Sequence, residues 1–153
     1  MTVWMESQES VGLSPELFHE FVFPYYRDLA EIFGLVYYGC CEPADPFWEK
    51  SLQYLPNLAA VSISRWANQA FMAEALAGRG IVYSRKPDPN LLGVDVKLNE
   101  TAWAEEIRHT LELTVPRGIP TQFIIRDVIT VHGNLQKPKR AVEIMRQEIS
   151  RIF

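Results

Sequence analysis

The sequence lacks the cysteine patterns that would assign it to a class directly. Only two cysteines occur among 153 residues, and they are adjacent, at Cys40 and Cys41. Adjacent cysteines make a poor disulfide framework, so we expect two reduced thiols. There is no C-x-x-C pair, and no histidine lies close to the two cysteines in the sequence. Internal repeats and low-complexity tracts are also missing.

Long apolar runs and clusters of positive charge are missing as well. No apolar stretch approaches the ~20 residues that a membrane span requires. The first residues do not show the basic and then apolar pattern of a signal peptide. The net charge is -4, and no basic cluster offers a nucleic-acid surface. The sequence therefore predicts a cytoplasmic protein that binds neither nucleic acid nor a membrane.

The chain does have enough apolar content for one packed core, because 48% of its residues are hydrophobic. Its length predicts a single domain covering residues 1–153. Short apolar segments alternate with helical patterns about five times along the chain. We expect strands at residues 3–5, 35–38, 58–63, 80–83 and 123–125, and helices that begin at Ser14, Asp45, Asn68, Asn99 and Pro138.

This alternation predicts an α/β fold with a parallel sheet and crossover helices. The apolar strand segments agree, because parallel strands are usually covered on both faces. Two architectures fit, namely an open doubly wound sheet and part of an eight-stranded α/β barrel. A complete barrel needs ~250 residues. In the second case the chain would therefore be only a part of the barrel.

The first expected helix carries an apolar stripe with helical spacing, formed by Leu17, Phe21, Tyr25, Leu29 and Ile32. Such spacing is typical of an amphipathic helix. Pro24 lies within the stripe and should kink the helix. The last helix carries a similar stripe of Val142, Met145, Ile149 and Ile152.

Polar residues follow each predicted strand, and in both architectures ligands bind beyond the carboxyl ends of the strands. We therefore expect these residues to face one shared opening. They are Gln8 and Glu9; Cys40, Cys41 and Glu42; Ser64, Arg65 and Trp66; Ser84, Arg85, Lys86 and Asp88; and Arg126 and Asp127.

The two thiols have two interpretations. Thiolates bind zinc well, and zinc can activate a further thiol as a nucleophile. Alternatively, Cys40 and Cys41 are small buried residues without reactivity. Neighbouring side chains of an extended strand point in opposite directions, so we expect only one of the two thiols to face the site.

The cations Arg65, Arg85 and Lys86 predict an anionic ligand such as a polycarboxylate, a sulfonate or a phosphate. The alternatives are a solvated surface charge and a salt bridge to Asp88. Three cations at two neighbouring strand ends favour the anion site.

The remaining candidates are each ambiguous. Asp127 could be a metal ligand or general base, or only the partner of Arg126 or a helix cap. Gln8 and Glu9 could contact a ligand or form hydrogen bonds within their loop. Trp66 could stack on a planar ligand or pack in the core.

Several segments resemble the uroporphyrinogen decarboxylase-like superfamily. They are residues 6–15 (ESQESVGLSP), 23–25 (FPY), 38–43 (YGCCEP), 61–66 (VSISRW) and 83–89 (YSRKPDP). The similarity is to the carboxyl-terminal part of longer proteins, in a branch that carries this Gly-Cys-Cys-Glu signature. The resemblance implies an α/β barrel.

That superfamily includes the haem-pathway decarboxylase, which needs no cofactor, and cobamide-dependent methyltransferases, which use zinc to activate a thiol. In the methyltransferases a His-x-Cys pair and a later Cys hold the metal. Here only Cys40 matches the pair, because Tyr38 replaces the histidine, and Asp127 falls near the later cysteine. A similar zinc site would need substituted ligands, with Cys41 or Glu42 contributing.

Residues and resemblance together predict the carboxyl-terminal portion of a TIM-type (β/α)8 barrel, with about five β/α units. The first functional hypothesis is corrinoid-linked methyl transfer at a thiol and metal site. Cys40 and Cys41 would be the metal ligands, and Glu42 and Asp127 the catalytic groups. The residues expected to bind substrate are Gln8, Glu9, Arg65, Trp66, Arg85 and Lys86.

The alternatives are a porphyrin-type carboxy-lyase without a cofactor and a non-catalytic part-barrel that only binds. The first hypothesis implies zinc, and a corrinoid on a partner protein. A small anionic substrate is expected in both enzymatic cases. An incomplete barrel exposes strand edges, so we expect a homo-oligomer or association with a missing amino-terminal half, and an inactive chain in isolation.

Overall fold

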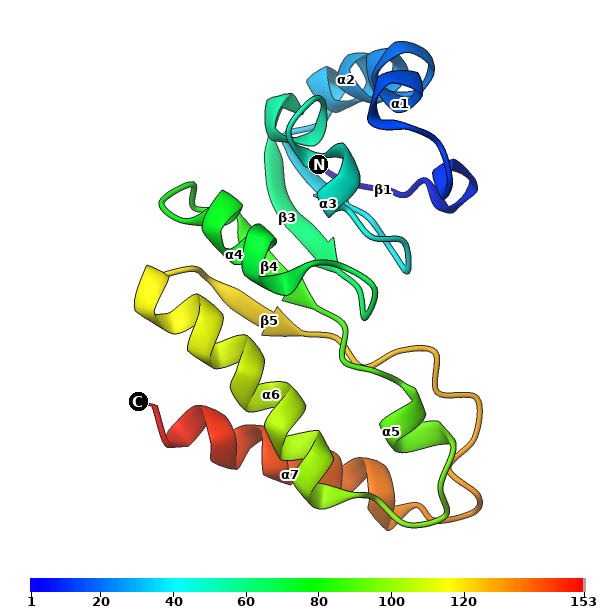
Figure 1. Cartoon of the computed structure of the whole chain (residues 1–153), viewed down its shortest axis with the longest axis vertical. Coiled ribbons are helices and arrows are strands. Elements are labelled where there is room, and N and C mark those ends of the chain that lie inside the picture. Colours follow the sequence, from blue (N-terminus) through cyan, green and yellow to red (C-terminus); the bar gives the residue numbers. More distant parts are fainter. Residues whose placement is uncertain (153) are drawn as a thin grey trace.

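A five-stranded sheet in which every strand is parallel to its neighbours forms the centre of the molecule (Figure 1). The computed structural model describes residues 1–152. The sheet follows chain order: β1 (Thr2–Met5), β2 (Leu35–Tyr38), β3 (Leu58–Ile63), β4 (Val82–Arg85) and β5 (Thr121–Phe123). The predicted α/β class with a parallel sheet is confirmed.

Helices connect each strand to the next. From β1 to β2 run α1 (Pro15–Phe21) and α2 (Phe23–Ile32), and from β2 to β3 runs the short α3 (Asp45–Trp48) with a 3-10 turn at Leu52–Tyr54. The later connections are α4 (Gln69–Leu76), α5 (Asn90–Gly93) and α6 (Glu100–Thr114), and α7 (Gln136–Ser150) follows β5. Further 3-10 turns lie at Gln8–Ser10 and Val115–Arg117.

Three of the predicted helix starts are confirmed by their capping hydrogen bonds. The side-chain oxygens of Ser14, Asn68 and Asn99 accept from the backbone N–H three residues later, at 3.2, 3.1 and 3.1 Å. These bonds satisfy donors that have no partner within the helix. The polar residues before each helix therefore specify where it begins.

Some predicted boundaries were wrong. β4 begins two residues later than expected and includes Ser84 and Arg85, which we had assigned to a loop. β5 ends at Phe123, where we had expected it to begin. Both strands are defined by backbone pairing with their neighbours, and this pairing continues through polar side chains. α5 was not predicted, and α7 begins two residues before Pro138.

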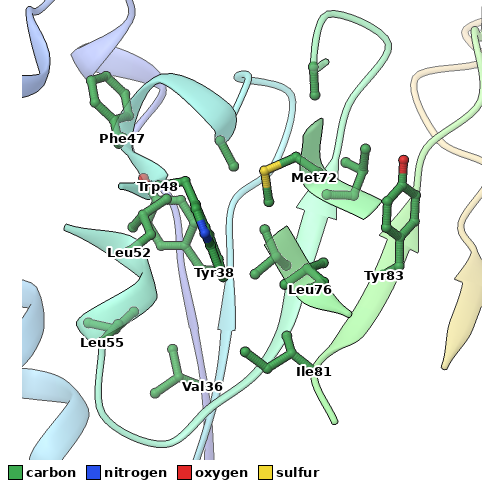
Figure 2. Close-up of a cluster of buried hydrophobic side chains, with 14 of the residues drawn as sticks. Val36, Tyr38, Phe47, Trp48, Leu52, Leu55, Met72, Leu76, Ile81 and Tyr83 are labelled. Carbon is green, nitrogen blue, oxygen red and sulfur yellow. The ribbon is translucent and has the colours of Figure 1, made fainter. Parts of the chain in front are cut away.

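One face of the sheet packs against the helices and forms the main core. Val36 and Tyr38 of β2 and Tyr83 of β4 lie in this core (Figure 2). They are joined there by Trp48 of α3 and by Met72 and Leu76 of α4. Trp103, Ile107 and Leu111 of α6 form a second cluster with Ala141 and Ile144 of α7.

The opposite face of the sheet, here called the open face, carries Trp4, Leu35, Tyr37, Ser62, Val82, Ser84 and Gln122 by strand alternation. Trp4 and Leu35 remain 56% and 52% exposed. The expectation that both faces of the sheet are covered is therefore wrong for this face.

The predicted stripe on the first helix is also exposed. The expected helix is interrupted at Val22, just before Pro24, so α1 and α2 are separate helices. Phe21 and Ile32 of the stripe are 61% and 71% exposed, whereas Phe18, Phe23 and Ala30 are buried on the other side. The break and the burial of this other face leave the stripe without a partner in residues 1–152. Val142 of α7 and Ile152, which lies just after this helix, are likewise more exposed than expected.

Within residues 1–152, no helix combines the length and the apolar character needed to cross a membrane.

The exposed stripe and the end position of β1 predict association. β1 pairs only with β2, so its other edge has free backbone groups. We expect multi-angle light scattering to show species heavier than the monomer as concentration rises. Replacing Phe21 and Ile32 with Ser should return the protein towards the monomer. Ile129→Ser, at a side chain that is 98% exposed but outside this edge, is the control. A monomeric unmodified protein at every concentration would contradict the prediction.

Candidate functional site

The carboxyl ends of β2 to β5 bring polar side chains together around a small pocket of about 50 Å³. Of the residues selected from the sequence, Cys41, Arg65, Trp66, Lys86 and Asp127 line it. Arg126, Ser64, Pro87 and Pro89 complete the lining. The structure thus places much of the predicted set at one shared opening.

The cysteine loop depends on Gly39, the first residue after β2. Gly39 has a φ of +92°, a conformation that residues with a Cβ rarely adopt. A Cβ there would lie 3.1 Å from the Cβ of Ser62. The chain therefore leaves the extended conformation before Cys40. For this reason the two thiols do not point in opposite directions as we had expected, and their sulfurs lie 3.6 Å apart.

The Cys40 carbonyl connects three strand ends. It accepts hydrogen bonds from Ser62 Oγ on β3 and from Lys86 Nζ after β4, both at 2.7 Å. The Cys40 sulfur accepts from Arg126 Nη1 after β5, also at 2.7 Å. Cys40 is only 1% exposed, so its role in the structure is to join neighbouring strand ends.

The carboxylate of Glu42 also holds the cysteine loop in place. It is buried and accepts from the Ser7 N–H at 3.0 Å and from the Cys40 N–H at 3.1 Å. It therefore joins the loop after β1 to the cysteine loop. Both carboxylate oxygens are occupied by these bonds, so the structure supports a positioning role for Glu42 more directly than the catalytic role expected from the sequence.

Cys41 is the thiol that faces the pocket. Its sulfur donates to Asp127 Oδ2 at 3.2 Å, and Arg126 Nε donates to Asp127 Oδ1, also at 3.2 Å. Burial, followed by the hydrogen bonds with Asp127 and Cys40, raises the pKa of the Cys41 thiol to about 12. At neutral pH Cys41 is therefore a thiol with a proton to give, not a thiolate.

Two cations lie over the ring of Trp4 on the open face. Lys86 Nζ is 5.6 Å and the Arg126 guanidinium 5.8 Å from its centre, within the range of cation–π attraction. Burial lowers the pKa of Lys86; the nearby Cys40 opposes this shift and Arg126 adds to it. The strand ends therefore concentrate positive charge beside the thiols.

A larger, more open pocket of about 380 Å³ adjoins the first. The two pockets share Cys41 and Trp66, and the larger one is also lined by Gln8, Val11, Glu42 and Pro43. A small space lined by charged side chains thus lies next to a wider one.

Two of the predicted substrate-binding residues are not brought to these pockets. Arg85 is 2% exposed on the helix side of the sheet, where it contacts Glu106 and donates to the carbonyls of Ile63 and Ser64 at 3.1 and 2.6 Å. Glu9 is exposed and lines neither pocket.

Arg65 reaches the small pocket but is already engaged there. Its Nη1 lies 2.7 Å from Asp88 Oδ1, and its guanidinium is 4.4 Å from the centre of the Trp66 ring. The salt bridge to Asp88, one of the two alternatives predicted for the cations, is thus formed by Arg65.

Sequence reasoning missed Trp4 and Tyr37. Tyr37 Oη lies 2.8 Å from Ser84 Oγ, and the rings of Trp4 and Tyr37 meet edge to face at 5.3 Å. The alternation of side chains along β1 and β2 was the available signal, because it places both aromatic rings on the face opposite the core.

The predicted zinc site does not fit this arrangement. In the described part of the chain, no three His, Cys, Asp or Glu side chains are grouped to hold a metal ion. Cys40, Cys41 and Asp127 come closest, but Arg126 already contacts both the Cys40 sulfur and the Asp127 carboxylate. A metal cation bound to these atoms would be repelled by the guanidinium.

No protein-family model matches the chain, and no curated protein or solved structure shows significant similarity to it. The resemblance of residues 38–43 and 83–89 to the uroporphyrinogen decarboxylase-like superfamily therefore remains a hypothesis.

Removing the hydrogen bond between Cys41 and Asp127 should make the Cys41 thiol more reactive. Asp127→Asn removes a negative charge and a strong acceptor, both of which raise the pKa of Cys41. The thiolate fraction at pH 8 should rise about tenfold for each unit by which this pKa falls. We therefore expect faster alkylation of Cys41 by iodoacetamide, measured by peptide mass spectrometry. Asp28→Asn, on the exposed surface of α2, is the control, and an unchanged rate in Asp127→Asn would contradict the assignment.

Proposed function

We propose that the chain is the carboxyl-terminal part of a TIM-type β/α barrel similar to the uroporphyrinogen decarboxylase-like superfamily, and that its strand ends bind a carboxylate substrate for a carboxy-lyase reaction. The strand order supports the barrel, because the five parallel strands follow chain order without the reversal of a doubly wound sheet. The open face, with its aromatic and small polar side chains, would then line the barrel interior.

The observation that carries the proposed function is the pair of cations at the ends of β4 and β5. Lys86 donates to the carbonyl of Cys40 and Arg126 donates to its sulfur, and both cations line the small pocket. Guanidinium groups bind carboxylates through charge-assisted hydrogen bonds. A pocket of about 50 Å³ is far below the ~300–1,000 Å³ of whole-ligand sites. It suits one carboxylate group of a larger substrate.

The same residues suit the loss of carbon dioxide. The bond between the carboxylate carbon and its neighbour breaks, carbon dioxide leaves, and the electron pair stays on the neighbouring carbon. The positive charges of Lys86 and Arg126 stabilise that negative charge. The Cys41 thiol, which is protonated at neutral pH, then supplies a proton to the carbon and recovers one from water. Asp127 orients the thiol through its hydrogen bond.

Methyl transfer linked to a corrinoid protein is the second candidate. It is favoured by the accessible Cys41 thiol, which has Asp127 as a proton acceptor 3.2 Å away. A third hypothesis, a part-barrel that only binds, predicts anion binding without turnover. Carbon dioxide release by the full-length protein, measured with uroporphyrinogen and with a 3-oxo acid, separates the carboxy-lyase from both of the others.

Removing the guanidinium should weaken carboxylate binding. We expect Arg126→Gln to raise the Kd for malonate, measured by isothermal titration calorimetry, by about 10- to 100-fold, because a hydrogen bond to a charged group contributes ~1.5–3 kcal/mol. Arg146→Gln, on the exposed side of α7, should bind malonate as the unmodified protein does. Equal affinity in Arg126→Gln would remove this residue from the site.

The position of Arg126 also predicts the metal content. We expect the purified, reduced protein to contain less than stoichiometric zinc, because the guanidinium contacts two of the three nearest ligand candidates. Elemental analysis checks this, with Cys40→Ser and Cys41→Ser measured alongside. Stoichiometric zinc that is lost in either variant would contradict the prediction and would place methyl transfer first.

A further inference from the structure

Lys86 is a buried lysine without a carboxylate partner among residues 1–152. It is only 4% exposed, and its one hydrogen bond is to the Cys40 carbonyl at 2.7 Å. Its chain neighbour Arg85 is equally buried but is paired with Glu106. Buried charges are normally paired, because removing an isolated charge from water is costly. An unpaired buried amine at a strand end therefore calls for a functional explanation.

The surroundings of Lys86 make its amine easier to deprotonate than that of an exposed lysine. Burial is the main cause that lowers the pKa of Lys86, and Arg126, a second cation nearby, adds to the shift. The groups that oppose this shift are Cys40, Cys41 and Glu42. A lysine with a lowered pKa has a larger neutral fraction at a given pH than an exposed lysine, and the neutral amine is the nucleophilic form because its nitrogen lone pair is free.

Strand geometry directs this amine to the open face. Lys86 follows Val82 and Ser84 at intervals of two residues along β4, so it continues the row of open-face positions. Its nitrogen lies 5.6 and 5.7 Å from the ring centres of Trp4 and Tyr37, which are on the same face. Lys86 also lines the small pocket together with Cys41 and Arg126. A nucleophile, a proton donor and a carboxylate-binding cation thus share one space.

We propose that Lys86 forms an imine between its side-chain nitrogen and the carbonyl carbon of a small oxo acid whose carboxylate is held by Arg126. The proposal rests on the carboxylate site proposed above and names the substrate class of that site. Nothing else in the pocket supplies a nitrogen nucleophile, because its other cationic side chains are guanidinium groups.

The chemistry balances without any added oxidant or reductant. The nitrogen lone pair attacks the carbonyl carbon, a proton moves from nitrogen to oxygen, and a proton taken up from solvent lets water leave as the protonated carbon–nitrogen double bond forms. With a 3-oxo acid, this protonated imine accepts the electron pair of the breaking carbon–carbon bond as carbon dioxide departs, which leaves a neutral enamine. A proton from the Cys41 thiol converts the enamine to a protonated imine. Water then adds and releases the product, and the proton left on the lysine nitrogen returns to the Cys41 thiolate, so that both groups are restored.

Reductive trapping with glyoxylate tests the imine directly. The protein is incubated with glyoxylate and sodium cyanoborohydride at pH 7, and the labelled peptides are mapped by mass spectrometry. We expect carboxymethylation of Lys86 to exceed that of the exposed Lys50, Lys97 and Lys139 several-fold, because the lowered pKa of Lys86 leaves a larger fraction of its amine neutral. Labelling of Lys86 should also reach half its maximum at a lower pH than labelling of these lysines.

Three controls separate the alternatives. Lys137 is also buried, but it lies on α7 outside the pocket, so preferential labelling there would show that burial alone causes reactivity and would overturn the proposal. Glycolate, which carries the carboxylate but no carbonyl, should slow the labelling of Lys86 and leave Lys97 unaffected. Lys86→Arg keeps the positive charge and should lose only the label at this position, with thermal unfolding measured to confirm that the variant is folded.

The proposed imine and the proposed carboxylate site can be tested independently. If malonate binds and Lys86 is labelled no more than Lys97, the imine is excluded while the carboxylate site stands. If malonate does not bind and Lys86 is not labelled, both proposals fall. Equal labelling of Lys86 in Arg126→Gln and in the unmodified protein would overturn the assigned role of Arg126 in holding the oxo acid.

Discussion

The backbone carbonyl of Cys40 is the point on which the arrangement of the site depends. It binds Ser62 from β3 and Lys86 from the end of β4, while the sulfur of the same residue binds Arg126 after β5. One residue thereby fixes the relative positions of four neighbouring strand ends, including its own. This is possible only because Gly39 turns the chain out of β2 at a φ of +92°. A residue with a Cβ at this position would crowd Ser62.

Holding the site in this way concentrates positive charge in a partly buried space. Arg126 is balanced by Asp127, whereas Lys86 contacts the Cys40 carbonyl and two aromatic rings and forms no ion pair among residues 1–152. Positive charge that is incompletely balanced within the protein favours an anionic ligand, because the ligand supplies the missing countercharge. The same imbalance disfavours a metal cation. The proposed anion binding and the proposed reactivity of Lys86 therefore rest on the same electrostatic arrangement.

Much exposed apolar surface lies near the β1 edge of the sheet. The helices that follow β1 carry the apolar stripe, β1 itself has a free edge, and Trp4 and Leu35 are exposed on the open face. A five-stranded sheet in chain order buries one face under its own helices and leaves the other to be covered in some other way. These surfaces agree with the proposal that the sheet is part of a larger barrel or assembly.

The amino-acid sequence by itself determined the α/β class, the order of strands and helices, and the starts at Ser14, Asn68 and Asn99, because these depend on local periodicity and local hydrogen bonds. It also indicated which polar residues follow the strands. Only the tertiary structure decided which of these side chains meet. Arg85 and Lys86 are adjacent in sequence, yet the pairing of β4 with β3 extends to Arg85 and directs it to the helix side, so that Lys86 faces the site. Cys41 and Asp127 are 86 residues apart and meet only because β5 is carried to the edge of the same sheet. Contacts of this kind depend on strand register and long-range packing, which local sequence patterns do not encode.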